Sequence, residues 1–261
     1  MRRRACSTGS GVITPGCAVA DPHRVFSLAL LLAVLACPAP ANVVQRPPVA
    51  FAPLQPGETL GAGWRLITLP GVKPTRFAWV EQAGRRLLRA DAAASAASLA
   101  RAVHRDLGED ARLEWRWRVD RVVARGDVHR PQGDDFAARL YVMFDYPTES
   151  LSLLARTRLN IARWLYGQHV PAAALCYVWG NREPLETRAW NAYTDRVRMI
   201  VLRNAGSGVG DWAVERRDLA ADYREAFGGP PPPVAAIAIG ADTDQTGETV
   251  AAWFGDIDLV E

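Results

Sequence analysis

A strict alternation of apolar and other side chains is the feature of this sequence that most constrains its fold. Residues 113–120 read Leu-Glu-Trp-Arg-Trp-Arg-Val-Asp, and apolar residues recur at every second position through residues 140–144. Successive side chains of a β-strand point to opposite faces, so both stretches are predicted as strands with one buried face. Similar patterns predict strands at Trp64–Leu69, Phe77–Glu81, Arg85–Ala90, Leu175–Trp179, Arg196–Arg203, Trp212–Asp218, Val234–Gly240 and Thr249–Leu259.

Two segments depart from this period. Residues 149–166 carry apolar side chains at helical spacing between Pro147 and Gly167, and they are predicted as a long helix. Residues 219–227, which precede Gly228, are predicted as a short one. A parallel α/β sheet needs a helix between most strands, which this pattern does not provide. We therefore expect a mainly β fold, a two-layer antiparallel β-sandwich with one long and one short helix inserted.

The first part of the chain has the pattern of a targeting segment. Residues 26–36 form an apolar run of eleven residues, which in a helix reaches roughly 16 Å, about half of a bilayer core. That length suits a signal peptide, and Ala39-Pro40-Ala41 offers a cleavage site, so residues 1–41 are predicted to be removed. Alternatively, Val34-Leu35-Ala36-Cys37 resembles a lipoprotein box, with Cys37 as the lipid anchor. Either reading predicts an exported protein, periplasmic or extracellular, with no transmembrane helix in the mature chain.

The charge of the mature chain argues against one class of partner. Residues 1–41 hold four of the 31 basic residues and one of the 28 acidic residues, so the formal charge of +3 belongs to the targeting segment. Residues 42–59 are rich in proline and read as a linker, which leaves 60–261 as a single β-sandwich domain. A neutral domain gives no support to nucleic-acid binding.

No motif points to catalysis. The sequence has no Gly-x-Ser-x-Gly, no zinc-ligand spacing and no phosphate-binding glycine loop. His104, His129 and His169 lie in polar or irregular contexts, away from any nucleophile motif. Cys176 lies in the apolar run Ala-Leu-Cys-Tyr-Val-Trp and is expected to be an inert core residue. We identify no catalytic residue from the sequence.

Several short segments resemble known proteins. Residues 87–91, 96–99 and 113–119 resemble the first half of a galactose-binding-type jelly roll. Over roughly residues 60–258 the chain is similar to a bacterial family of exported proteins known only as domain of unknown function 3047. The segments that carry this similarity are Gly133–Arg139, Tyr177–Asn181, Tyr193–Arg198, Ile237–Ile239, Asp242–Asp244, Thr246–Gly247 and Gly255–Ile257. The resemblance implies a jelly-roll-like fold and an envelope location but no activity, so residue roles have to come from chemistry.

Two groups of acids are candidates for a cation or a ligand. Asp134 and Asp135 precede a predicted strand, where adjacent side chains point to opposite faces, so we expect at most one of them to serve a given site. The alternative is a solvated turn. Asp242, Asp244 and Thr246 place oxygen atoms on one side of a tight loop, as calcium loops do. An EF-hand is excluded, because Trp253 stands where its last glutamate is needed. The loop is therefore a candidate Ca²⁺ site, and the alternative is a β-turn that uses Asp and Gly for its backbone.

A third group combines aromatic rings with amide and charged side chains. Its members are Trp179, Asn181, Trp190, Asn191, Tyr193, Asp195 and Arg196. Aromatic rings offer a flat apolar surface to a sugar ring, while amides, carboxylates and guanidinium groups bind hydroxyls. We expect these residues, with Asp134 and Asp135, to form a ligand-binding surface. The alternative is a long loop that packs its aromatic rings against the edge of the sheet.

The leading prediction is a non-catalytic exported β-sandwich that binds a glycan or another polyol of the cell envelope. It would require no cofactor, with Ca²⁺ as a candidate ion. One alternative is a hydrolase that acts on polysaccharide through a pair of carboxylates. The other is a structural or assembly protein of the envelope that has no small ligand.

Overall fold

The structure is a computed structural model, and it describes residues 60–260 except 109, 152, 154–155 and 157–170. The predicted signal peptide 1–41, the linker 42–59 and most of the long helix predicted at 149–166 lie outside the described residues. So does His169.

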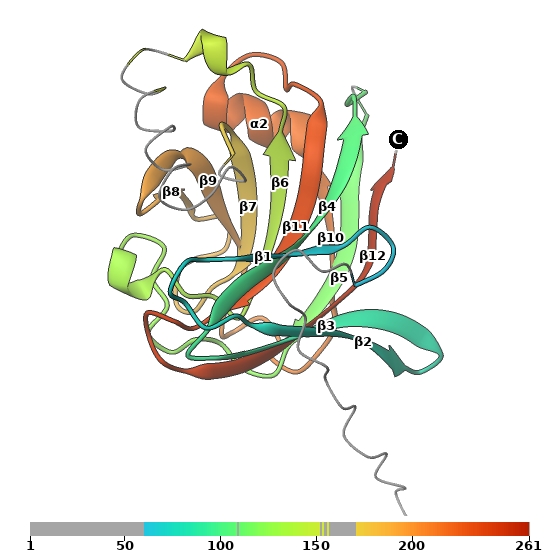
Figure 1. The fold of residues 1–261 in the computed structure, drawn as a ribbon, viewed down its shortest axis with the longest axis vertical. Helices are drawn as coiled ribbons and strands as arrows, with labels where there is room; N and C mark the ends of the chain where they lie inside the picture. The colour runs from blue at the N-terminus through green and yellow to red at the C-terminus, as the bar shows by residue number, and fades with distance from the viewer. Residues whose placement is uncertain (1–59, 109, 152, 154–155, 157–170, 261) are drawn as a thin grey trace, which may run out of the picture. The chain divides into compact units, whose positions relative to one another are not determined.

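Two β-sheets pack face to face and confirm the predicted mainly β sandwich (Figure 1). The seven-stranded sheet has the order β1-β4-β11-β6-β7-β9-β8, and the five-stranded sheet has the order β10-β5-β12-β3-β2. The strands are β1 (Arg65–Thr68), β2 (Arg76–Gln82), β3 (Arg85–Ala93), β4 (Ala96–Arg105), β5 (Arg112–Val119), β6 (Ala138–Phe144), β7 (Ala174–Trp179), β8 (Arg188–Asn191), β9 (Thr194–Arg203), β10 (Ala213–Asp218), β11 (Val234–Asp242) and β12 (Thr249–Val260).

One strand pair differs from the predicted antiparallel pattern. β7 and β9 are parallel, whereas the other pairs within the described sheets are antiparallel. The chain leaves β7, forms β8 at the outer edge of the sheet, and returns as β9 between β7 and β8. Since β8 pairs antiparallel with β9, β8 runs opposite to β7, and the chain reverses once more to make β9 parallel to β7.

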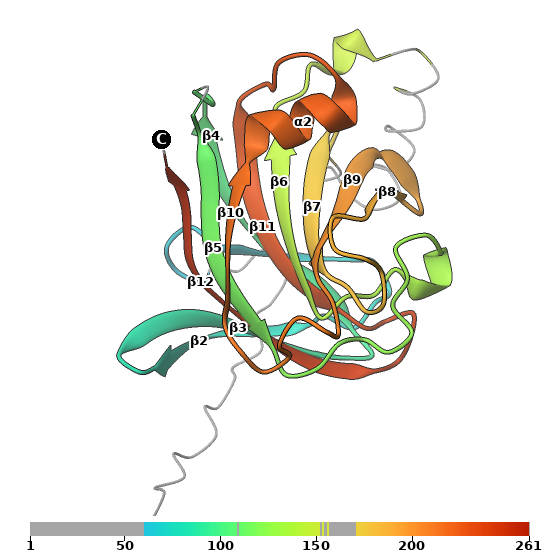
Figure 2. The same ribbon diagram turned by 180° about the vertical axis from the view of Figure 1, so that it is seen from behind.

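The predicted short helix is confirmed as α2 (Leu219–Phe227), which lies across one end of the sandwich (Figure 2). It begins at Asp218, whose side chain accepts a hydrogen bond from the backbone N–H of Ala221, and it ends at Gly228 with φ of 73°. A carboxylate at the first position and a glycine after the last turn are the usual caps of a helix. Two short 3₁₀ turns also occur, η1 (Pro131–Gly133) and η2 (Thr148–Ser150).

Aromatic rings fill the space between the sheets. Trp115 and Trp117 of β5 contact Tyr177 and Trp179 of β7, with ring centroids 5.2 Å and 5.7 Å apart in the two pairs. All four side chains are at most 1% exposed. The contacts join a strand of one sheet to a strand of the other, so these rings hold the two layers together.

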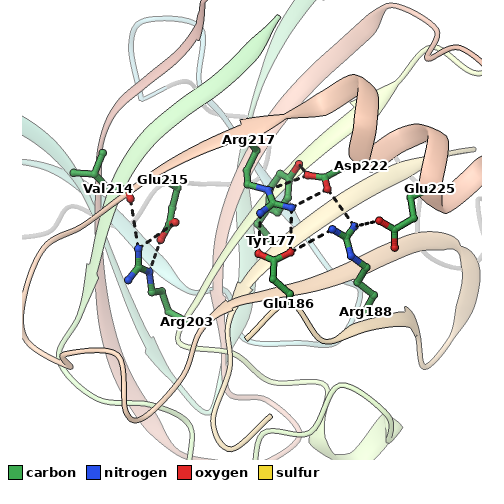
Figure 3. Close-up of polar contacts among 9 residues, drawn as sticks. All are labelled: Tyr177, Glu186, Arg188, Arg203, Val214, Glu215, Arg217, Asp222 and Glu225. Atoms are coloured by element: carbon green, nitrogen blue, oxygen red, sulfur yellow. Dashed lines mark hydrogen bonds and ion pairs between the residues drawn. The ribbon is translucent and has the colours of Figure 1, made fainter. Parts of the chain in front are cut away.

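Ion pairs close the edge where β10 meets β8 and β9 (Figure 3). Arg203 of β9 pairs with Glu215 of β10 at 2.6 Å, and Arg217 of β10 pairs with Asp222 of α2 at 2.8 Å. Asp222 is 4% exposed and also accepts hydrogen bonds from Tyr177 and Arg188. These contacts link β7, β8 and β9 of one sheet to β10 of the other and to α2.

Candidate functional site

The outer face of the seven-stranded sheet carries a groove of about 1030 Å³. Its floor is made by small side chains of two neighbouring strands, β4 and β11. These are Ala96, Ser98, Ala100, Ala102, Ala236, Ala238 and Gly240. They alternate with core residues such as Leu99 and Ile239, so the same strands present bulky residues to the interior and small ones to the groove.

Larger side chains form the walls of the groove. Arg139, Tyr141 and Met143 of β6 lie on one side, next to the small residues of β11. Arg65 and Ile67 of β1 lie on the other side, next to those of β4. The groove therefore results from residue size, because the small side chains of β4 and β11 form two rows between β1 and β6, which carry large ones.

Beyond β6, the outer face of the same sheet is covered. Val128 and Phe136, from the segment between β5 and β6, pack with Cys176 of β7 and Met199 of β9 in a second apolar cluster. Among the described residues, this cover leaves β1, β4, β11 and β6 as the main strands of the groove, with Asn191 and Val197 at its edge. It also buries the Cys176 thiol completely, which raises its pKa to about 12. The prediction that Cys176 is a core residue is confirmed.

Arg139 is the central charged group at one end of the groove, and it is only 3% exposed. Its Nε donates to Asp242 Oδ1 at 2.9 Å, and its Nη2 lies 2.5 Å from Asp242 Oδ2. Its Nη1 donates to Asp134 Oδ1 at 3.1 Å, and its Nη2 also donates to the backbone oxygen of Asp134. Burial alone would lower the pKa of Arg139, but Asp134 and Asp242 raise it well above its ordinary value. The guanidinium therefore stays charged.

Four carboxylates gather around this arginine. Asp134 and Asp242 bind it directly, while Asp135 and Asp244 lie behind Asp242. Burial raises the pKa of Asp242 to about 7, against the opposing effect of Arg139. Burial also raises the pKa of Asp244, and the neighbouring Asp135 carboxylate adds to that shift. Both shifts have the same origin, because negative charge is crowded in a place that water hardly reaches.

The structure brings the two predicted acidic groups together. Oxygen atoms of Asp135, Asp242 and Asp244 lie within 4.8 Å of one another. The backbone N–H of Thr246 donates to Asp135 Oδ2 at 2.6 Å. Asp134 and Asp135 make different contacts here: Asp134 pairs with Arg139, whereas Asp135 lies against Asp242 and Asp244. Asp134 is not in a strand but ends η1 with φ of −75° and ψ of 49°, so strand alternation does not apply there.

Of the third predicted group, Asn191 is the residue that lines the groove. Its Nδ2 donates to Asp134 Oδ2 at 2.9 Å, which connects the β8–β9 hairpin to the acidic cluster. Tyr193 is 60% exposed, and its hydroxyl donates to the backbone oxygen of Pro131. Asp195 is exposed and pairs with its neighbour Arg196 at 3.3 Å.

Three of the predicted aromatic and amide residues do not face the groove. Trp179 is fully buried between the sheets, which corrects the expectation that its indole meets a ligand. Asn181 is also buried, and its Nδ2 donates to the backbone oxygen of Ala124 at 2.6 Å. Trp190 lies in β8, is 37% exposed and packs against Phe227 of α2.

Sequence reasoning missed the groove and its central residue. Arg139 lies in a strand whose other face is apolar. From the sequence of that strand, a buried arginine cannot be told from a solvated one. The usable signal was the recurrence of small residues at every second position in 96–102 and 236–240. Such a pattern indicates a strand face that is low enough to admit another molecule.

Comparisons with known proteins identify a family and distant structural similarities. The sequence matches the family model described as Protein of unknown function (DUF3047) over residues 62–258. No curated protein matches the chain. A solved structure titled the xyloglucanase domain of NopAA, a type three effector from Sinorhizobium fredii in complex with cellobiose, is 10% identical, with a TM-score of 0.39 over 76% of this chain and 92% of that chain. Another, Cellulose induced protein, Cip1, is 10% identical, with a TM-score of 0.32 over 76% of this chain and 90% of that chain. At these scores neither similarity says anything about the ligand of this chain.

One further finding concerns membranes. Within the described residues, no helix has the length and apolar character needed to cross a bilayer.

Proposed function

The chain belongs to the DUF3047 family of proteins of unknown function. Its role therefore has to be inferred from its own residues. We propose that it is a non-catalytic binding protein whose groove holds a glycan. The observation that carries the proposal is the open groove of about 1030 Å³ with a floor of alanine, serine and glycine. Ligand pockets commonly have volumes of about 300–1000 Å³. This groove is therefore large enough for an oligosaccharide.

The lining has the two kinds of surface that a sugar needs. The alanine floor and the ring of Tyr141 are apolar, which suits the C–H face of a pyranose ring. Around them, Ser98 and Asn191 supply polar groups that can bind hydroxyls. Since the floor side chains are short, a flat ring can approach the sheet closely.

The hydrolase alternative has less support. A glycosidase needs two carboxyl groups that flank the scissile bond. Among the described residues, Asp242 is the one acid that lines the groove, and both of its oxygens contact Arg139. Asp134 binds the same guanidinium. The two acids therefore share one cation and do not face each other across a cleft.

Binding to a panel of oligosaccharides, measured by titration calorimetry, tests the proposal. We expect saturable binding without turnover for at least one envelope-type glycan. Ala100→Trp places an indole on the half-buried centre of the floor, and we expect it to weaken binding at least tenfold. Val214→Trp is the matched control, because Val214 is 70% exposed on β10 and lies outside the groove lining.

Two results would contradict the proposal. One is unchanged binding by Ala100→Trp, which would place the ligand elsewhere. The other is the absence of binding to every glycan, which, together with co-purification of an envelope protein, would favour a structural or assembly role. Release of sugar products would instead favour the hydrolase.

A further inference from the structure

We propose that Asp135, Asp242 and Asp244 form a binding site for Ca²⁺ beside the acidic end of the groove. The site does not depend on the glycan proposal, because its ligands and its test involve the ion alone.

The geometry matches a shared ion. One carboxylate oxygen from each of the three residues lies within 4.8 Å of those of the other two. Oxygens bind Ca²⁺ at about 2.3–2.6 Å, so two that share the ion lie at most about 5 Å apart. The three acids come from two loops, since Asp135 precedes β6 whereas Asp242 and Asp244 stand at the end of β11 and in the following turn.

Asp135 supplies the second, independent observation. It is 0% exposed, and its Oδ1 is buried without a hydrogen-bond partner. Its Oδ2 is held by the backbone N–H of Thr246 at 2.6 Å. A buried carboxylate oxygen with no partner is costly, because nothing replaces the water it has lost. A cation bound at that oxygen would replace it.

The charges of the cluster also call for a cation. Asp134, Asp135, Asp242 and Asp244 lie together, and among the described residues Arg139 is the cation that forms ion pairs with them. When ionised, these groups leave a surplus of negative charge in a mostly buried place. Isolated buried charges are strongly unfavourable, so the cluster must take up either protons or a cation.

The donor atoms select the class of ion. All three side chains offer carboxylate oxygens, which suit hard cations such as Ca²⁺, whereas zinc sites are built mainly from cysteine and histidine. Thr246, expected from the sequence to be a ligand, adjoins these acids, and its backbone N–H donates to Asp135. The turn that carries it is closed by the Gly247 N–H, which donates to the Thr243 oxygen at 2.8 Å.

The test uses the full chain, stripped with a chelator and titrated with CaCl₂ by calorimetry and thermal melting. We expect saturable binding of one ion and a rise in melting temperature. Asp244→Asn keeps the size of the side chain but removes its charge, and we expect at least a tenfold loss of Ca²⁺ affinity. Asp195→Asn, at an exposed acid outside the cluster, should bind like the unmodified protein.

The outcomes that would overturn the site are distinct from those that concern the glycan. The site would be overturned if millimolar Ca²⁺ produced no heat of binding and no shift in melting temperature. It would also be overturned if Asp244→Asn and the unmodified chain bound Ca²⁺ with equal affinity. A response to Mg²⁺ with none to Ca²⁺ would overturn the assignment of calcium. If Asp244→Asn fails to fold, the titration of the unmodified chain still decides whether the ion binds.

Discussion

Gly240 is a residue at which a single missing side chain makes room for the site. It lies opposite Ser98 of β4 on one side and Arg139 of β6 on the other. A Cβ at this position would come within 3.0 Å of Ser98 Oγ and 3.3 Å of the backbone oxygen of Ala97. The glycine therefore allows β4 to keep Ser98 and the backbone of Ala97 in place at the charged end of the groove.

Adding a side chain at Gly240 is expected to destabilise the protein. Gly240→Val should lower the free energy of unfolding by about 1–3 kcal/mol, the usual effect of overpacking, and Gly240→Ala should have a smaller effect. Urea denaturation measures both. Because the nearest atom is Ser98 Oγ, Ser98→Ala should restore part of the stability in the Gly240→Ala background. Equal stability of Gly240→Val and the unmodified chain would show that a side chain at position 240 fits beside Ser98 and Ala97 without strain.

The Cys176 thiol is expected to be unreactive in the folded protein. It is 0% exposed, and burial raises its pKa to about 12, so at neutral pH hardly any thiolate is present or accessible. Alkylation by iodoacetamide at pH 8, followed by peptide mass spectrometry, should label Cys176 only after denaturant is added. Labelling of the native protein at a rate like that of a free thiol would contradict the packing of β7.

The site residues show which kinds of position a sequence reveals. The acids of 134–135 and 242–244 were identified because carboxylates in turns are conspicuous. Trp179 was misplaced because every side chain of β7 is buried. A strand that is buried on both faces has no polar face to show the direction of its side chains. Its indole is therefore as compatible with a surface as with a core until the partner strand is known.

At the scale of elements, the edge between β10 and the β8–β9 hairpin is held by charge rather than by apolar packing. Asp222 of α2 accepts hydrogen bonds from Tyr177 of β7, Arg188 of β8 and Arg217 of β10 (Figure 3). Burial, and then the Asp222 charge, raise the pKa of Tyr177 well above its ordinary value, so its hydroxyl remains a donor. One carboxylate thus connects both sheets and the helix.

Removing that carboxylate is expected to be costly. Asp222→Ala leaves the buried Tyr177 hydroxyl without its acceptor and leaves Arg217 with the exposed Glu186 alone. Loss of one partner of a buried ion pair typically costs about 3–5 kcal/mol. Glu225→Ala is the matched control on the same helix. Glu225 also pairs with Arg188 but its side chain is 52% exposed, so we expect a change of about 0–1 kcal/mol. Chemical denaturation compares the two, and similar effects would contradict a central role for Asp222.

Arginines and tryptophans interleave on the outer face of the five-stranded sheet. The Arg118 guanidinium lies 4.2 Å from the ring centroid of Trp253 and 5.2 Å from that of Trp212. The alternation in residues 113–120 correctly predicted that the charged side chains leave the core. It did not reveal that indoles from β12 and from the segment before β10 would cover them, because those contacts join residues far apart in sequence.

The elements themselves were predictable to different degrees. Strands with one apolar face were found, but β4 was missed because its sequence, Ala-Ala-Ser-Leu-Ala-Arg-Ala-Val-His-Arg, is rich in alanine, the strongest helix former. Pairing with β1 and β11 on its two sides overrides that preference. β8 was missed because its sequence, Arg-Ala-Trp-Asn, shows no alternation of apolar and polar side chains. The missed β4 forms half of the groove floor, so the site could not be found from the predicted strands alone.

At the scale of the whole molecule, the two-layer architecture follows from the alternation of residues, but the groove does not. It needs β4, β11 and β6 to be neighbours, and these strands are separated in the chain by other elements of both sheets. It also needs Asp135 and Asp242 to meet across more than a hundred positions of sequence. Long-range pairing of this kind is decided by the order of strands, which local patterns do not fix.

The glycan proposed for the groove belongs to the cell envelope, so the protein can bind it only after export from the cytoplasm. The run at residues 26–36 predicts that, in a bacterial host, the chain is exported and cut after Ala41, so that the mature protein begins at Asn42. Cell fractionation and intact mass measure both outcomes. Cys37→Ser should leave processing unchanged, because Cys37 lies inside the removed segment. The lipoprotein alternative would instead be established by two results together. The unmodified mature chain would begin at an acylated Cys37 in the membrane fraction, and the Cys37→Ser variant would be found in the soluble fraction. An uncut chain in the cytoplasm would contradict export, and the groove would then need a ligand from inside the cell.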